Sequence, residues 1–186
     1  NRGTIGVYVD DSQVGTITEG KPTVTHVVTA KKPDGTPINP ADVLKWAASV
    51  EQRSEHPLAH AILKAAQDKQ VTLLPVEKFA VMEGRGVRGT VDRRIIEVIS
   101  LRHARERSLE LGSLGSDADR LATQARSPVI VVVNNTVYAV IAISDPIKPT
   151  SKAAVALLNR LGLPIVLVSG DSRSGAEAVA MEVGIT

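Results

Sequence analysis

Residues 50–62 read VEQRSEHPLAHAI, a helix-forming stretch that is interrupted by one proline. Pro57 lacks a backbone N–H and is tolerated only in the first turn of a helix. The stretch therefore predicts that one helix ends and a second begins at Ser54, a residue type that caps helices well. Glu55 and His56 would then lie at a helix N-terminus, where backbone N–H groups are unpaired and the helix dipole is positive. An acid and an imidazole there indicate either a structural hydrogen-bonding role or a bound ligand.

The composition limits the kinds of protein that this chain can be. Of its 186 residues, 43% are hydrophobic but only 2% are aromatic, so Val, Ile, Leu and Ala have to build the core. The chain has no cysteine, which excludes disulfides, thiolate metal sites and a cysteine nucleophile within it. A net charge of +2 with so few aromatic residues argues against nucleic acid as a partner. The apolar runs are far shorter than the ~20 residues of a membrane span, so we expect no direct membrane insertion.

The middle of the chain has the pattern of short strands interleaved with helices. We expect helices over residues 40–49, 57–69, 101–111 and 117–125, and strands over residues 22–30, 76–82, 86–92, 94–99, 129–133 and 137–143. Asn134 and Asn135 tolerate positive φ and would close the last two strands into a hairpin. This part of the chain therefore predicts an antiparallel sheet flanked by helices.

The pattern changes after Asp145. A periodic helix is expected over residues 151–161, then a strand over the apolar run 163–168, then a helix over residues 172–183. A continuous apolar run is typical of a strand buried on both faces, and such an α–β–α piece belongs to a doubly wound sheet. We therefore expect an α+β chain in which the antiparallel middle is inserted into a partial α/β domain made by the two ends.

A glycine-rich segment, residues 83–89, reads EGRGVRG. It contains G-x-G-x-x-G, but a dinucleotide fingerprint needs a helix after the glycines, and here both flanks are β-like. What remains is a turn lined by Gly84 and Gly86, where a flat ligand could lie against the backbone. A tight hairpin or bulge without a ligand is the plainer alternative. With Glu55 to accept from an adenine amine and His56 to stack on the ring, the turn would suit a purine nucleotide.

Ser169, Gly170 and Asp171 follow the predicted strand at residues 163–168 and precede a helix. Ligands of open α/β sheets bind at the carboxyl ends of strands, and a hydroxyl beside free N–H groups suits a phosphate. A strand-to-helix turn that binds nothing is the alternative.

Together these motifs resemble the P-type ATPases, specifically the heavy-metal (P1B, copper-transporting-like) branch. SEHPLAHAI resembles the SEHPLA signature of that branch, and EGRGVRG resembles its second nucleotide-binding motif. Three further segments resemble the end of the phosphorylation motif, the return hinge and the T-G-D-N segment: VGTITEGKPTVT (14–25), SDPIKP (144–149) and residues 168–186. The resemblance covers almost the whole chain.

The resemblance implies a fold, a ligand and partners. Residues 23–144 would be the nucleotide-binding domain, and residues 1–22 and 145–186 would be parts of a haloacid-dehalogenase-like phosphorylation domain. ATP would be bound by Glu55, His56, Gly84, Gly86, Val87 and Ser100, while Thr16, Ser169, Gly170 and Asp171 would face the phosphoryl group. Mg²⁺ is implied in the intact protein. The implied partners are the rest of the phosphorylation domain, an actuator domain and membrane helices, with this chain on the cytoplasmic side of the transporter.

The phosphorylation motif departs from the pattern DKTGT, in which the nucleophilic Asp lies three residues before the glycine. Counting back from Gly15 gives Ser12, which cannot form an acyl phosphate. Asp10 and Asp11 come too early, so a shifted loop would be needed to present one of them, and Asp11 is our catalytic candidate.

Three functions are therefore open. The first is the ATP-binding region of a heavy-metal transporter, copper by family prior, which would not turn over alone because later Lys and magnesium-binding motifs are missing from this sequence. The second is a degenerate, non-catalytic nucleotide-binding or interaction module. The third, a small phosphatase, needs a D-x-D or D-x-T motif and is the weakest.

Overall fold

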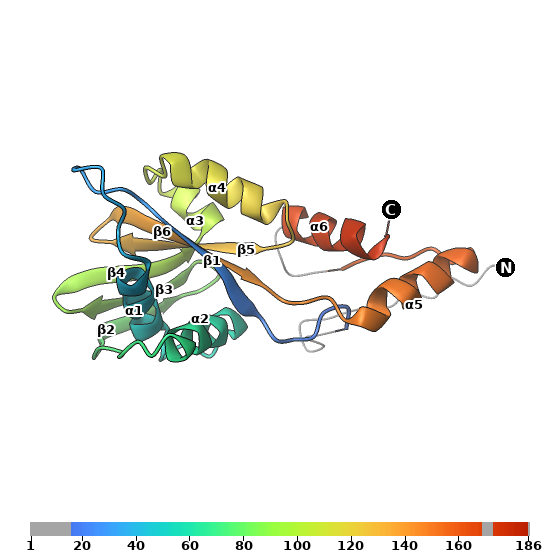
Figure 1. The fold of residues 1–186 in the computed structure, drawn as a ribbon, viewed down its shortest axis with the longest axis horizontal. Coiled ribbons are helices and arrows are strands. Elements are labelled where there is room, and N and C mark those ends of the chain that lie inside the picture. The colour runs from blue at the N-terminus through green and yellow to red at the C-terminus, as the bar shows by residue number, and fades with distance from the viewer. Residues whose placement is uncertain (1–15, 169–172, 186) are drawn as a thin grey trace. The chain divides into compact units, whose positions relative to one another are not determined.

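A computed structural model of the chain describes residues 16–168 and 173–185 (Figure 1). The chain divides into two compact units. The larger unit comprises residues 22–121 and 127–144, and the smaller comprises the described parts of residues 1–21, 122–126 and 145–186.

The larger unit is built on one six-stranded antiparallel sheet. Its strands follow the spatial order β1 (Thr23–Thr29), β6 (Thr136–Ser144), β5 (Ser127–Val133), β4 (Arg94–Ser100), β3 (Gly86–Val91) and β2 (Glu77–Met82). Strands β1 and β6, the first and the last along the chain, are neighbours in the sheet, and Thr23 of β1 is paired with Ser144 of β6. The chain therefore enters and leaves this unit at one place.

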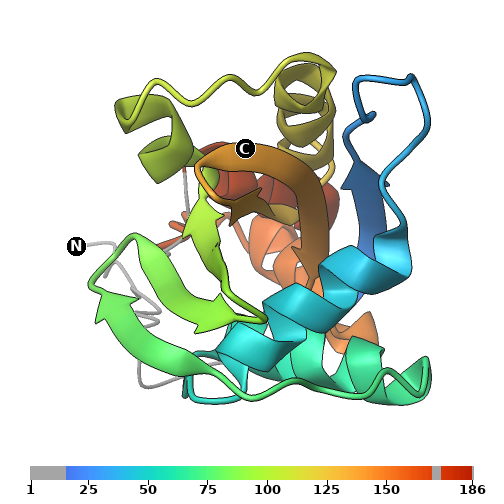
Figure 2. The ribbon, with the colours of Figure 1, turned by 90° about the vertical axis from the view of Figure 1, so that its left-hand side faces the viewer.

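Helices cover both faces of this sheet (Figures 1 and 2). On one face lie α1 (Pro40–Glu51) and α2 (Pro57–Asp68), and on the other lie α3 (Leu101–Glu106) and α4 (Ser113–Ala122). Strand β5 serves both cores, because Val131 packs under the first pair of helices and Ile130 and Val132 under the second. The antiparallel sheet with flanking helices is thus confirmed, and its core is aliphatic as the composition requires.

Three predicted helix boundaries need correction. The second helix begins at Pro57 and is capped by His56, not by Ser54. Helix α3 ends at Glu106 because Ser108 has a φ of 52° and the Leu109 N–H bonds back to the Ala104 carbonyl at 3.0 Å, a Schellman stop. Helix α4 begins at Ser113, four residues before the predicted start at residue 117.

In the smaller unit, α5 (Pro149–Arg160) packs on α6 (Arg173–Val183). Lys152 pairs with Glu182 at 3.3 Å. The predicted strand over residues 163–168 is wrong: the segment has no strand pairing, and Val166 is 71% exposed. A strand exists only against a neighbouring strand, and the described residues of this unit contain none.

The segments that join the units run side by side within the smaller unit. The carboxylate of Asp145 accepts hydrogen bonds from the backbone N–H groups of Gly20 (3.1 Å) and Lys21 (2.9 Å). Backbone bonds continue the pairing, from Glu19 N to Pro146 O at 2.8 Å and from Lys148 N to Ile17 O at 2.9 Å. None of the helices in the described ranges is long and apolar enough to span a membrane.

Candidate functional site

The turn between α1 and α2 is a continuous hydrogen-bonded chain. The Ser54 N–H donates to the Glu51 carbonyl at 2.9 Å, and the His56 N–H donates to the Ser54 hydroxyl at 3.3 Å. The imidazole Nδ1 of His56 then accepts from the Leu58 N–H at 3.2 Å. Ser54, predicted as a helix cap, instead connects the end of the first helix to the residue that does cap the second.

His56 therefore has a structural role, which was the plainer of the two sequence interpretations. Because its Nδ1 accepts a hydrogen bond, the ring carries its proton on Nε2. The residue is exposed, so the Nε2–H and the ring faces remain open to a ligand. Capping and ligand binding use different atoms of the ring and do not exclude each other.

Glu51 is the residue of this turn that sequence reasoning missed. It is 6% exposed, and its Oε2 has no hydrogen-bond partner among the described residues. Burial raises the pKa of the Glu51 carboxyl from 4.5 to about 7, and a hydrogen bond from the Ser54 side chain opposes this rise. A carboxylate oxygen that is buried without a partner is costly, and a donor group that reaches it would offset that cost.

A signal for Glu51 is present in the sequence. Val43 and Ala47 are buried on α1, and Glu51 continues the same i, i+4 row. An acid that continues an apolar row is expected to be buried. Glu55, the predicted acid, is instead exposed.

The glycine segment forms the tight turn between β2 and β3. Gly84 and Gly86 have φ values of 65° and 136°. A Cβ on Gly86 would overlap the carbonyl oxygen of Val98, so this position has to be glycine for the strands to pair. The hairpin alternative is therefore the observed structure, and backbone packing explains one glycine of the motif without a ligand.

The glycine strand packs against the end of α1. A Cβ on Gly89 would lie 3.5 Å from Val50, the residue next to Glu51, and 2.6 Å from Val76. Gly86 lies three residues before Gly89 on β3, about 10 Å away at the usual rise per residue. The end of α1, where Glu51 lies, thus packs beside the strand that leads to the glycine turn.

Ser100 and Val87 are placed by the same hairpin. The Ser100 N–H donates to the Arg85 carbonyl at 2.9 Å, which ties the end of β4 to the turn. Its hydroxyl accepts from the His103 N–H at 3.1 Å and caps α3. Val87 is 4% exposed, belongs to the core under α1 and α2 and is paired with Val81 and Val98 of the neighbouring strands, so its side chain is not open to a ligand.

Of the residues predicted to face the phosphoryl group, only Thr16 lies within the described part of the chain. Thr16 is exposed and lies in the smaller unit. Asp11, Ser12, Ser169, Gly170 and Asp171 lie outside the described residues. Within residues 16–168 and 173–185, no group of three or more His, Asp or Glu side chains is placed to hold a metal ion.

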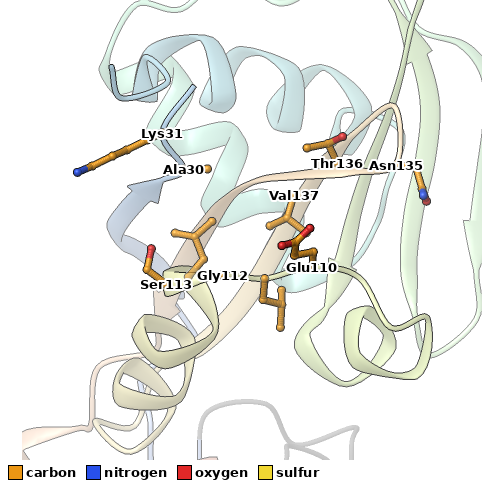
Figure 3. Close-up of a pocket in the computed structure, with 10 residues that line it drawn as sticks. Ala30, Lys31, Glu110, Gly112, Ser113, Asn135, Thr136 and Val137 are labelled. Atoms are coloured by element: carbon orange, nitrogen blue, oxygen red, sulfur yellow. The ribbon is translucent and has the colours of Figure 1, made fainter. Parts of the chain in front are cut away.

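A shallow cavity of about 370 Å³ lies elsewhere in the larger unit (Figure 3). It is lined by residues 30–31, 110–114 and 135–137, and none of the predicted nucleotide-binding residues is among them. Its two charged side chains do not converge, since Lys31 extends away from Glu110 in Figure 3. We therefore place the candidate site at the α1–α2 turn and the glycine hairpin.

Comparisons with known proteins agree on the family. Residues 14–186 match the haloacid dehalogenase-like hydrolases. Copper-transporting ATPase 1 of Rhizobium meliloti (strain 1021) is 36% identical over 93% of this chain, and the copper-exporting P-type ATPase of Vibrio cholerae is 35% identical over 94%. The alignments span 20% and 18% of those two proteins, so the chain corresponds to about a fifth of their length.

Solved structures support the same assignment. A zinc-transporting PIB-type ATPase superposes with a TM-score of 0.70 at 29% identity, covering 91% of this chain and 26% of that one. The catalytic domain of a CPx-ATPase gives 0.64 at 30% identity, covering 94% and 56%. The N-domain of a copper-transporting P-type ATPase gives 0.52 at 29% identity, covering 67% of this chain and 99% of that one. The chain belongs to the haloacid dehalogenase-like hydrolase family, and its homologues there are the P1B-type, copper-transporting P-type ATPases.

Proposed function

We propose that the larger unit binds the adenine of ATP and presents its phosphates to the phosphorylation domain of a heavy-metal transporter, with copper as the expected ion. The observation that carries this proposal is the buried, unpartnered Oε2 of Glu51, three residues from the Ser54–His56 hydrogen bond. A carboxylate oxygen accepts from the exocyclic amine of adenine, and the ring of His56 offers a stacking face or the Nε2–H.

The site also gives a reason to prefer adenine over guanine. Adenine presents an amine where guanine presents a carbonyl oxygen. Above about pH 7, where Glu51 is ionised, its carboxylate attracts the amine and repels the carbonyl oxygen, so Glu51 is expected to favour ATP over GTP. Glu55 stays a second candidate for this contact, because it is exposed at the same helix mouth.

Mg²⁺ has no candidate site in the described part of the chain, since no acidic cluster is present there. We expect the ion to reach this unit bound to the nucleotide, and we assign it no step. The remaining phosphorylation domain, the actuator domain and the membrane helices are proposed partners of the intact protein, and would place this chain on the cytoplasmic side of the membrane.

The test is a calorimetric titration of ATP and GTP into the chain. A millimolar constant, about −4 kcal/mol, is a realistic strength for an isolated domain. We expect ATP to bind more tightly than GTP and His56→Ala to abolish binding. Glu51→Gln keeps the size of the side chain, and its amide can turn either an oxygen or an N–H toward the base, so it should reduce the preference for ATP.

Glu55→Gln is the matched control, because it makes the same change four residues later at an exposed position. If Glu55→Gln loses the preference for ATP while Glu51→Gln keeps it, the adenine contact belongs to Glu55. Absence of ATP binding by the unaltered chain would overturn the proposal.

A second function, a non-catalytic nucleotide-binding module, is favoured by one observation: Ser12 stands where the family has its phosphorylated Asp. It predicts ATP binding without a hydroxylamine-sensitive phosphoprotein. Detection of such a phosphoprotein in the intact transporter, lost in Asp11→Asn, would reject this alternative.

A further inference from the structure

Arg85 lies at the tip of the glycine hairpin, between Gly84 and Gly86. Its backbone is fixed on both sides, because its N–H donates to the Met82 carbonyl at 2.9 Å and its carbonyl accepts from the Ser100 N–H at 2.9 Å. The neighbouring residues, Gly84 and Gly86, have no side chains that could cover the side chain of Arg85. The Cα from which this side chain extends is therefore held by a hydrogen-bonded turn.

The guanidinium of Arg85 is exposed and has no acidic or aromatic partner among the residues that the structure describes. Three other arginines of the larger unit do have partners. Arg107 bonds to Glu97 at 3.0 Å, and Arg105 holds both oxygens of Asp119 at 2.7 and 2.8 Å. Arg94 lies 5.0 Å above the ring of Trp46.

We propose that Arg85 binds the phosphate groups of the nucleotide whose base lies at Glu51 and His56. The inference rests on the proposed function and adds a phosphate contact to it. The hairpin tip is about 10 Å along β3 from Gly89, which packs beside the end of α1. A nucleotide with its base at that end extends its phosphates over such a distance, and a guanidinium matches phosphate oxygens with two parallel hydrogen bonds.

The experiment compares ATP with adenosine in four forms of the full chain: unaltered, Arg85→Ala, Arg85→Lys and Arg93→Ala. Arg93 is the matched control, since it is exposed in the neighbouring β3–β4 turn and also has no partner among the described residues. Adenosine binding is followed by NMR titration, which detects millimolar affinity. Melting temperatures report folding.

We expect Arg85→Ala to weaken ATP binding on the order of tenfold, with adenosine unchanged, because only ATP carries the charged group. Arg85→Lys should recover part of the loss, since it keeps the charge but not the planar fork. The dependence of ATP affinity on salt should also become weaker in Arg85→Ala. Arg93→Ala should match the unaltered chain.

Unchanged ATP affinity in Arg85→Ala would overturn the inference, and so would an equal loss for ATP and adenosine, which would indicate a structural role. These results differ from failure of the proposed function, which would appear as no ATP binding by the unaltered chain.

Discussion

The Nδ1 atom of His56 accepts a hydrogen bond from the backbone N–H of Leu58 at 3.2 Å, so the imidazole that we propose as a nucleotide ligand also caps α2. The contact selects the Nε2–H tautomer and orients the ring. Loss of ATP binding in a His56 variant therefore has two explanations, a lost ligand contact or a displaced helix end.

Asparagine separates these two explanations. His56→Ala should lower the free energy of unfolding by about 1 kcal/mol, because it removes the cap. His56→Asn should retain most of that stability, since Asn is among the best capping residues. Its affinity for ATP should nevertheless be as low as that of His56→Ala, because Asn has no ring. Urea denaturation and calorimetry on both variants test this. Tight ATP binding by His56→Asn would show that the ring contributes only through the cap.

The pKa of Glu51 predicts a pH-dependent stability. Its pKa is about 7 in the folded chain against 4.5 for an unperturbed carboxyl, so the folded state holds the proton more tightly. The contribution of Glu51 to the free energy of unfolding is therefore fully present below pH 4.5, falls as the pH rises, and is lost once the pH passes about 7. A gap of about 2.5 pH units corresponds to about 3 kcal/mol.

Glu51→Gln should remove this dependence between pH 4.5 and 7, because the amide does not titrate. Urea denaturation at several pH values is the measurement. Glu55→Gln, at an exposed position, should leave the slope intact. If the slope persists in Glu51→Gln, the pH dependence of stability arises from another group.

Local patterns predicted the strands and helices of the larger unit well, because each signal was short-range. Asn134 and Asn135, with φ values of 47° and 65°, form the expected hairpin turn. The strand over residues 163–168 failed because a strand depends on a partner elsewhere in the fold. Glu51 was missed for a related reason: its burial depends on the packing of α1 against the sheet, and the SEHP motif drew attention to its exposed neighbour instead.

The two glycines of the hairpin should respond differently to alanine. Gly86→Ala should destabilise the chain by about 3 kcal/mol or more, since its Cβ would overlap the Val98 carbonyl in backbone that cannot move freely. Gly84→Ala should cost only about 1–2 kcal/mol, because its φ of 65° is left-handed but the surrounding space is open. Equal losses in urea denaturation would contradict the structural role given to Gly86.

The carboxylate of Asp145 should protect the amides that it binds. It accepts from Gly20 at 3.1 Å and from Lys21 at 2.9 Å, at the point where two segments distant in sequence run together. Asp145→Ala leaves both N–H groups without this acceptor, so their hydrogen exchange should accelerate on the order of tenfold. Asp145→Asn keeps one oxygen and should give an intermediate rate. Exchange followed by NMR resolves the two amides individually.

Asp34 offers a matched control for that experiment, because its carboxylate makes the same kind of bond to the Thr36 N–H, at 2.9 Å, in a turn of the larger unit. Asp34→Ala should accelerate exchange at Thr36 and leave Gly20 and Lys21 unchanged. If Asp145→Ala instead accelerates exchange throughout α5, the carboxylate stabilises the whole smaller unit and not only the joining segments. If Gly20 and Lys21 exchange at the same rate with and without the carboxylate, the backbone bonds between Glu19 and Pro146 and between Lys148 and Ile17 are sufficient to hold the joining segments together.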